Sequence, residues 1–382
     1  MWSIRGLANR LALHGLARKP SVQPTSIGWA RDFLTPARYD EAERAAVKRL
    51  SVPIMMAFRP VTYRSVGFPV SVTDEVELAR YVDHNYEQEV PGLYKPGASF
   101  APVAYVNAFT PDERDLFNQI RERVVALSSI LFGQPVRPIT NLMVQMGPFR
   151  IMHEIARVTG SKTLSVFEAG PGLGYLGALL ALTGHRYASF DVTQALYLWQ
   201  NRLLQVAASG DLLEAAIHSD LPPLDKARVV HLPWWHFVQL RTTSPVRADI
   251  VYSNSNLGEM SPLARKHLLQ AGRNILANSK IGLFMYMSTG MLAHGTAESL
   301  HAEFEAFGYV KVCDIPFIGY THGSRNVSSL LDAFKNGVPH FSPSGAPATL
   351  AANEVMALKR SEAPLDCQIS EWSHGWQPPF VD

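Results

Sequence analysis

The chain has 382 residues, of which 47% are hydrophobic and only 18% are charged. This composition is too apolar for a disordered chain, and the length allows more than one folding unit. Lys and Arg number 35 and Asp and Glu number 33, giving a net charge of +2. That balance gives no reason to expect a nucleic acid or an anionic membrane as a partner.

The two cysteines, Cys313 and Cys367, are far apart and belong to no Cys/His cluster. We therefore expect no disulfide framework or structural zinc site, and a reducing, cytoplasmic location. Residues 1–30 contain basic but no acidic side chains, which we interpret as a basic surface helix or arm, with an amphipathic targeting segment as the alternative. We expect no transmembrane segment, because no stretch of about twenty residues is continuously apolar.

Helical signals and proline-rich joints fill residues 1–160. Thr73 precedes an acidic first turn, and Thr110 is followed by Pro111 and two acidic residues, which is the pattern of a capped helix start. Apolar residues then follow at spacings of three and four, at Leu116, Ile120, Val124, Leu127 and Leu131. A further helix is expected over residues 141–158, with an interruption at Gly147-Pro148.

Strand and helix signals alternate over residues 161–335. We expect strands at 164–167, 187–190, 228–232, 249–252, 281–287 and 310–313, and helices at 175–183, 193–208, 261–277 and 298–307. This alternation predicts right-handed βαβ units and a mostly parallel sheet, which binds ligands beyond the carboxyl ends of its strands. Residues 336–382 are rich in Pro, Ser and Gly and are expected to form an irregular tail.

A glycine-rich loop follows the first strand of this zone, in the sequence Phe167-Glu168-Ala169-Gly170-Pro171-Gly172-Leu173-Gly174. Glycines let the backbone turn sharply and let a ligand approach the main chain, while the next helix directs free N–H groups at that ligand. Residues 172–177 also satisfy the dinucleotide pattern GxGxxG, and Asp191 ends the second strand.

The glycines alone fit two cofactors, so the flanking acids must discriminate between them. Glu168 precedes the glycines, where a carboxylate suits a cationic ligand and disfavours a pyrophosphate. Asp191 can accept hydrogen bonds from ribose hydroxyls with either cofactor. These residues favour S-adenosyl-L-methionine, with an NAD(P)-dependent oxidoreductase as the alternative.

The segment Glu168 to Gly174, followed by Asp191, resembles the first two motifs of class I S-adenosylmethionine-dependent methyltransferases. A narrower resemblance, to the putative sugar O-methyltransferase group, rests on Asn141-Leu142-Met143, Pro233-Trp234 and the segment 254–260. The resemblance implies an α/β fold, with a Rossmann-like methyltransferase sheet flanked by helices over residues 161–335. The mainly helical N-terminal region, residues 1–160, would cover the acceptor site.

The resemblance also implies roles for individual residues. Glu168, Gly170, Gly172 and Gly174 would hold the methionine end of the cofactor, and Asp191 would bind its ribose. The adenine would lie near Leu232, Pro233 and Trp234. Asn254 and its neighbours would form the wall between the cofactor and the acceptor.

Methyl transfer to oxygen often needs a base that removes the proton of a hydroxyl. Three residues after expected strands are candidates, namely Glu259, His294 and His322. No metal-ligand set stands out, although a magnesium site built from scattered carboxylates stays open. We expect O-methylation of a hydroxyl on a sugar or sugar-containing metabolite, with a small-molecule or glycan acceptor. A non-catalytic partner subunit with a methyltransferase fold is the alternative outside enzymes.

Overall fold

A computed structural model describes residues 33–51, 58, 71–87, 109–133, 135–136, 138, 140–241, 244–254, 256–258, 260–287, 297–314 and 354–358. All elements described below belong to one unit that begins at Leu34. Among the described helices, none combines the length and the apolarity that crossing a bilayer requires.

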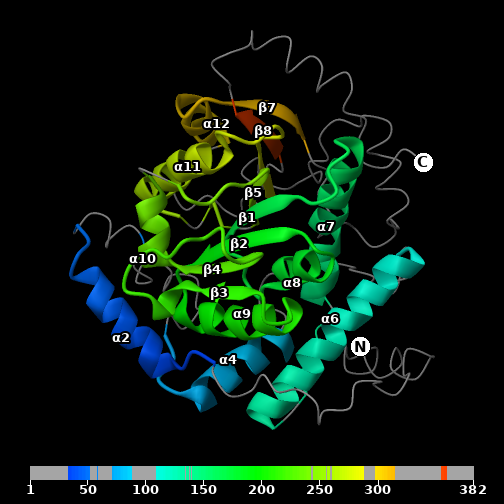
Figure 1. The fold of residues 1–382 in the computed structure, drawn as a ribbon, viewed down its shortest axis with the longest axis vertical. Helices are drawn as coiled ribbons and strands as arrows, with labels where there is room; N and C mark the ends of the chain where they lie inside the picture. The colour runs from blue at the N-terminus through cyan, green and yellow to red at the C-terminus, as the bar shows by residue number, and fades with distance from the viewer. Residues whose placement is uncertain are drawn as a thin grey trace, which may run out of the picture. The chain divides into compact units, whose positions relative to one another are not determined.

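The core is an eight-stranded sheet with the strand order β3-β4-β2-β1-β5-β6-β8-β7, which can be followed in Figure 1. The strands from β3 to β6 are all parallel, whereas β8 runs antiparallel to both β6 and β7. Their bounds are β1 Ser165–Ala169, β2 Arg186–Asp191, β3 Leu212–Glu214, β4 Val229–Pro233, β5 Ile250–Asn254, β6 Leu283–Met287, β7 Tyr309–Asp314 and β8 Glu354–Leu358.

Helices cover both faces of this sheet. On one face, Tyr197 of α9 (Gln194–Ala207) stacks on His231 of β4 with ring centroids 4.0 Å apart. On the other, Phe237 of α10 (Trp234–Phe237) stacks on Phe190 of β2 at 3.6 Å. Phe190 pairs with Leu232, the neighbour of His231, and successive strand residues point to opposite faces. The fold is therefore α/β with a doubly covered, Rossmann-like sheet, as expected from the alternating pattern.

The remaining helices follow the same division. The first face also carries α8 (Tyr175–Leu182), against which α6 (Pro111–Phe132) and α7 (Thr140–Val158) pack. The second face carries α11 (Pro262–Leu276), the short helix η4 (Val238–Arg241) and α12 (Ala297–Ala306). Two further N-terminal helices, α2 (Pro36–Val47) and α4 (Glu75–Glu87), pack against α9 near the β3 edge (Figure 1).

The helix starts in the N-terminal region are largely as the sequence indicates. Thr110 and Glu113 form a reciprocal capping box at the start of α6. At α4, however, Asp74 caps the helix, because its Oδ1 accepts hydrogen bonds from the backbone N–H of Val76 and Glu77 at 2.8 and 2.9 Å. The expected interruption at Gly147-Pro148 is wrong, since α7 continues through Pro148. Buried side chains on both sides of this proline hold the helix together, at Met146, Phe149, Ile151 and Met152.

Several short elements have no counterpart in the sequence expectations. They are α2, β3, the 3-10 helix η3 (Ala215–Ile217), α10, η4 and β8. The strand β8 lies within the segment expected to be an irregular tail, yet it pairs with β6 and β7. Residues 354–358 therefore complete the sheet, and that expectation is wrong for this strand. The three-part division of the chain at residues 160 and 335 stays a prediction.

Candidate cofactor site

The sheet brings most of the expected cofactor residues to one edge. The strands β4, β2, β1 and β5 are consecutive neighbours, and their carboxyl ends lie in register, with Asp191 opposite Pro233 and Ala169 opposite Ser253. At or just beyond these ends lie Glu168, Gly170, Gly172, Gly174, Asp191, Leu232, Pro233, Trp234 and Asn254. Parallel strands thus gather residues that are up to 86 positions apart in the chain, counted from Glu168 to Asn254.

The glycine loop has a backbone that only glycine adopts readily. Gly170, Gly172 and Gly174 all have positive φ, at +64°, +58° and +76°. A Cβ on Gly170 would lie 2.3 Å from Nδ2 of Asn256, whereas a Cβ on Gly172 would meet nothing within 4 Å. Gly174 precedes α8 and provides no side-chain cap, so the first N–H groups of that helix are open to a ligand.

Glu168 lies under this loop as a buried acid. Its Oε2 accepts a hydrogen bond of 2.6 Å from the hydroxyl of Tyr187, and only 1% of the residue is exposed. Burial raises the pKa of Glu168 to about 8, although the Tyr187 hydrogen bond lowers it. Glu168, expected from the sequence to be a carboxylate, is therefore mostly protonated at neutral pH.

Asp191 is held from two sides. Its Oδ1 accepts a hydrogen bond of 2.8 Å from the backbone N–H of Thr193, and its Oδ2 accepts one of 2.8 Å from Nε2 of Gln200. Burial raises the pKa of Asp191 to about 6, and these two hydrogen bonds oppose that rise. Asp191 therefore caps the turn before α9, yet it stays largely ionised at neutral pH and has lone pairs left for a ligand.

The expected adenine residues are packed against an N-terminal helix. Leu232 and Trp234 are fully buried, and Nε1 of Trp234 donates a hydrogen bond of 2.6 Å to Glu43 of α2. Tyr39 of the same helix packs against Trp235, with ring centroids 4.9 Å apart. The helix α2 thus covers the carboxyl end of β4. Asn254 is half-buried at the end of β5.

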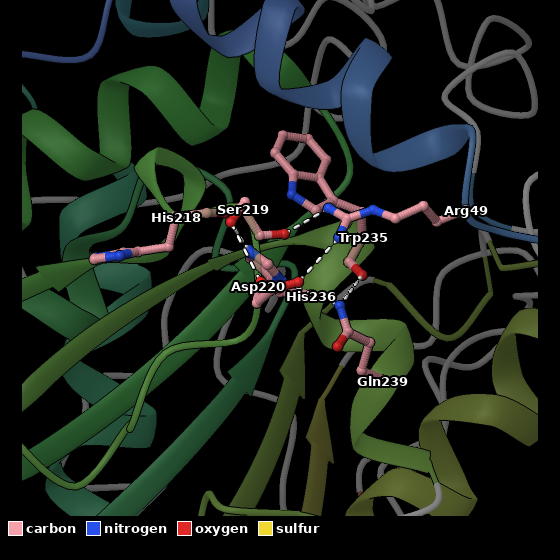
Figure 2. Close-up of polar contacts among 7 residues, drawn as sticks. All are labelled: Arg49, His218, Ser219, Asp220, Trp235, His236 and Gln239. Atoms are coloured by element: carbon pink, nitrogen blue, oxygen red, sulfur yellow. Dashed lines mark hydrogen bonds and ion pairs between the residues drawn. The ribbon is translucent and has the colours of Figure 1, made fainter.

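A cavity of about 260 Å³ opens beside α2, away from the two acids. Its walls are α2, η3 with the two residues that follow, and Trp235. Arg49 lines one wall and pairs with Asp220 at 2.9 Å, a contact drawn in Figure 2. His236 contacts the wall that follows η3, with Nε2 on the carbonyl of His218 at 3.0 Å and Nδ1 on Gln239 at 3.2 Å (Figure 2). Both of its ring nitrogens are engaged, and burial lowers its pKa, so His236 has a packing role.

The three base candidates, Glu259, His294 and His322, lie outside the described residues. Within the described ranges, no group of three or more His, Cys, Asp or Glu side chains could hold a metal ion. Asn256, within the segment 254–260 on which the resemblance rests, lies beside Gly170. Sequence reasoning missed Tyr187 and Gln200, which contact Glu168 and Asp191. A polar residue in mid-strand or mid-helix carries no motif, so only the tertiary contacts identify them.

Comparison with known proteins gives similarity in fold only. No protein-family model matches the chain, and no curated protein matches its sequence. Similar solved structures include a TehB-like SAM-dependent methyltransferase from Corynebacterium glutamicum, with 13% identity, a TM-score of 0.34, and coverage of 54% of this chain and 88% of that one. Another is the N-methyltransferase NodS from Bradyrhizobium japonicum, solved with S-adenosyl-L-homocysteine. It has 10% identity, a TM-score of 0.33, and coverage of 56% and 89%.

A third similar structure is the magnesium protoporphyrin IX methyltransferase from Synechocystis with bound SAM, at 11% identity and a TM-score of 0.32. This similarity covers 66% of this chain and 100% of that one. With identities of 10–13% and TM-scores of 0.32–0.34, these similarities support no conclusion about this chain. The Rossmann-like class of this chain follows from its own strand order and from helices on both faces of the sheet.

Proposed function

We propose that this protein is an S-adenosyl-L-methionine-dependent methyltransferase. The observation that carries the proposal is the placement of Glu168 and Asp191 on either side of one glycine loop, at the carboxyl ends of neighbouring parallel strands. Ligands of such sheets bind in this position. The acid at β2 suits a ribose diol, and the buried acid at β1 suits the cationic end of the cofactor.

Glu168 also discriminates between S-adenosyl-L-methionine and NAD(P), the two cofactors that the glycine pattern allows. A buried carboxyl with a pKa of about 8 ionises readily only when a positive charge approaches it. The methionine end of S-adenosyl-L-methionine carries such charges, whereas the pyrophosphate of NAD(P) would hold Glu168 in its protonated form. The site therefore favours the methyl donor over the dinucleotide.

For the acceptor we propose a hydroxyl, carried by a sugar or a sugar-containing metabolite. Support comes from the short segments that resemble the putative sugar O-methyltransferase group, at 141–143, 233–234 and 254–260. Bound S-adenosyl-L-methionine would supply a methyl group to the acceptor oxygen, with S-adenosyl-L-homocysteine as the leaving group. The hydroxyl proton passes to a base, for which Glu259, His294 and His322 are the candidates.

We also propose that residues 1–160 cover the acceptor site. Support comes from α2, which reaches the carboxyl edge of the sheet. Asp40 accepts a hydrogen bond of 2.6 Å from Gln194, and Glu43 accepts the one from Trp234. An N-terminal helix is therefore already anchored beside the residues expected near the adenosine.

Calorimetry tests the cofactor. The wild-type protein should bind S-adenosyl-L-homocysteine more tightly than NADH or NADPH, and Asp191→Asn should weaken that binding at least tenfold. The matched control is Asp225→Asn, because Asp225 is an exposed acid on the loop before β4. Tighter binding of a dinucleotide, or no binding of S-adenosyl-L-homocysteine by folded protein, would overturn the proposal.

Mass spectrometry tests the acceptor class. Incubation with S-adenosyl-L-methionine and a panel of sugars, nucleotide sugars and, for comparison, amines should give a sugar product heavier by one methylene. Replacement of the true base, by Glu259→Gln, His294→Asn or His322→Asn, should then lower kcat while leaving the Kd of S-adenosyl-L-homocysteine unchanged. Methylation confined to amine acceptors would contradict the hydroxyl assignment but not the cofactor.

A further inference from the structure

Gln200 links the two halves of the candidate cofactor site. It lies in the middle of α9 and is fully buried. Its Nε2 donates a hydrogen bond of 2.8 Å to Oδ2 of Asp191 and another of 2.5 Å to the carbonyl oxygen of Gly172. One amide group therefore connects the acid at the end of β2 with the glycine loop after β1.

The orientation of this amide is dictated by its partners. A carboxylate and a backbone carbonyl are both acceptors, so only the NH2 group can satisfy them together. The opposite orientation would place Oε1 against two oxygens. As it stands, Oε1 of Gln200 is buried and has no hydrogen-bond partner in the part of the chain that the structure describes. An unpaired buried acceptor is unfavourable. The amide therefore leaves Oε1 without a hydrogen bond while its NH2 group makes the two bonds to Asp191 and Gly172.

The aliphatic part of the Gln200 side chain also packs closely against the glycine loop. A Cβ on Gly174 would lie 3.2 Å from Cγ of Gln200 and 3.6 Å from its Cα. The helix α9 therefore approaches the loop so closely that a Cβ on Gly174 would push the Gln200 side chain aside by a few tenths of an ångström, and the positive φ of Gly174 also favours glycine. The residue touches the loop at both Gly172 and Gly174, which are 28 and 26 positions before it in the chain.

We propose that Gln200 is a positioning residue that sets Asp191 for recognition of a vicinal diol, such as the ribose of an adenosine cofactor. With Oδ2 fixed by Gln200 and Oδ1 fixed by Thr193, the carboxylate plane cannot rotate. The backbone N–H of Val192 and the side chain of Thr193 also act on this carboxylate. Because a carboxylate oxygen can accept two hydrogen bonds, two adjacent hydroxyls would donate to the two oxygens beside the bonds from Gln200 and from the Thr193 N–H. This proposal rests on the proposed function, because it assumes an adenosine ligand at this edge.

The same hydrogen bond keeps Asp191 ionised. It lowers the pKa of Asp191 against the opposing effect of burial. The other titratable groups facing Asp191 are Glu168 of β1, Tyr187 of β2 and Tyr39 of α2, and none of them is a cation. Loss of the Gln200 amide should therefore raise the pKa of Asp191 further and weaken diol binding most at low pH.

Calorimetry on the full chain at pH 6 and pH 8 tests this role. The ligands are S-adenosyl-L-homocysteine and its 2′,3′-dideoxyribose analogue. Gln200→Met keeps an unbranched stem against Gly174 but removes the NH2 group. It should weaken S-adenosyl-L-homocysteine binding at least tenfold, with a larger loss at pH 6, while the dideoxy analogue changes less than twofold. Gln205→Met, on the same helix, is the matched control and should leave both affinities unchanged.

The outcomes separate the two proposals. If the folded wild-type protein binds no S-adenosyl-L-homocysteine, the proposed function and the role of Gln200 both fail. If the wild type binds it and Gln200→Met has an unchanged Kd, only the role of Gln200 fails. Equal losses for both ligands at both pH values would show that Gln200 merely supports the fold, and would also overturn the positioning role.

Discussion

The hydroxyl of Tyr187 donates a hydrogen bond of 2.6 Å to Oε2 of Glu168, and both side chains are buried. The ring of Tyr187 also faces α8, where a Cβ on Gly177 would lie 2.5 Å from its Cε1 and Cζ. One aromatic side chain thus orients the acid at the candidate cofactor site and sets how closely α8 approaches the sheet. The third glycine of the GxGxxG pattern is explained by this packing and need not contact a phosphate.

Ligand binding should release a proton from Glu168. The free protein has a pKa of about 8 at this residue, so about nine-tenths of the molecules are protonated there at pH 7. A bound ammonium or sulfonium group lowers that pKa, so affinity should rise with pH between about 6 and 8. Calorimetry in buffers of different ionisation enthalpy should show release of close to one proton per S-adenosyl-L-homocysteine.

Glu168→Gln provides the control for this measurement, because its amide cannot ionise. The buffer dependence should then disappear while the protein stays folded. A wild-type binding enthalpy that is identical in all buffers would contradict the placement of the ligand's cation beside Glu168.

Gly177→Ala should destabilise the protein despite the better helix propensity of alanine. The added Cβ must displace the buried ring of Tyr187, and overpacking of this kind costs about 1–3 kcal/mol. Urea unfolding measures the change. In a Tyr187→Leu background the same substitution should cost much less, because the ring atoms that it meets are gone. Additive effects of the two substitutions would show that the clash is relieved elsewhere.

The free energy of unfolding should fall as pH rises from 6.5 to 8. Glu168 has a folded pKa raised from 4.5 to about 8, so between these values the folded state binds the extra proton and stability declines with pH. Glu214, raised to about 7, acts in the same direction. His231 has a pKa lowered to about 3, and it reduces stability only below its unfolded value of 6.5.

Titration of Glu168 should lower the free energy of unfolding by about 2 kcal/mol between pH 6.5 and pH 8. Urea unfolding at several pH values should therefore show a clear slope for the wild type and a shallower one for Glu168→Gln. Glu305→Gln, which changes an exposed acid at the end of α12, should keep the wild-type slope. A slope that Glu168→Gln does not alter would assign the titration to other groups.

The sheet could be predicted from the sequence because the patterns that indicate its strands and covering helices are local. Six of the strands and four of the covering helices lie within a few residues of their expected bounds, since each has its own hydrophobic pattern and is bounded by its own turn residues. The strand β8 escaped prediction because its five residues lie in a Pro- and Gly-rich segment. Its partner β6 lies some 70 residues earlier in the chain, where Leu283 pairs with Ala357.

Only those residues of the candidate site that stand at the ends of strands could be predicted from the sequence. Glu168 and Asp191 stand at such ends, and the parallel sheet must bring such ends together. Gln200 lies in the middle of a helix, and its contacts with Gly172 and Asp191 arise only when α9 packs beside the loop. The protonation of Glu168 could likewise not be predicted from the sequence, because it depends on burial by other segments of the chain.

Gly170 and Gly172 should respond differently to alanine. Both have a positive φ, so each substitution should cost about 1–2 kcal/mol of backbone strain. At Gly170 the new Cβ would also meet Nδ2 of Asn256 at 2.3 Å, and that side chain must rotate away. Gly170→Ala should therefore lose more stability in urea unfolding, and adding Asn256→Ala should recover the difference.

At Gly172 the space around the new Cβ is open, with nothing within 4 Å in the described structure. Under the proposed function this space belongs to the cofactor. Gly172→Ala should therefore weaken S-adenosyl-L-homocysteine binding at least tenfold while reducing stability only by the backbone strain. An unchanged Kd for Gly172→Ala would place the ligand elsewhere, because a cofactor lying against this loop must meet the added methyl group.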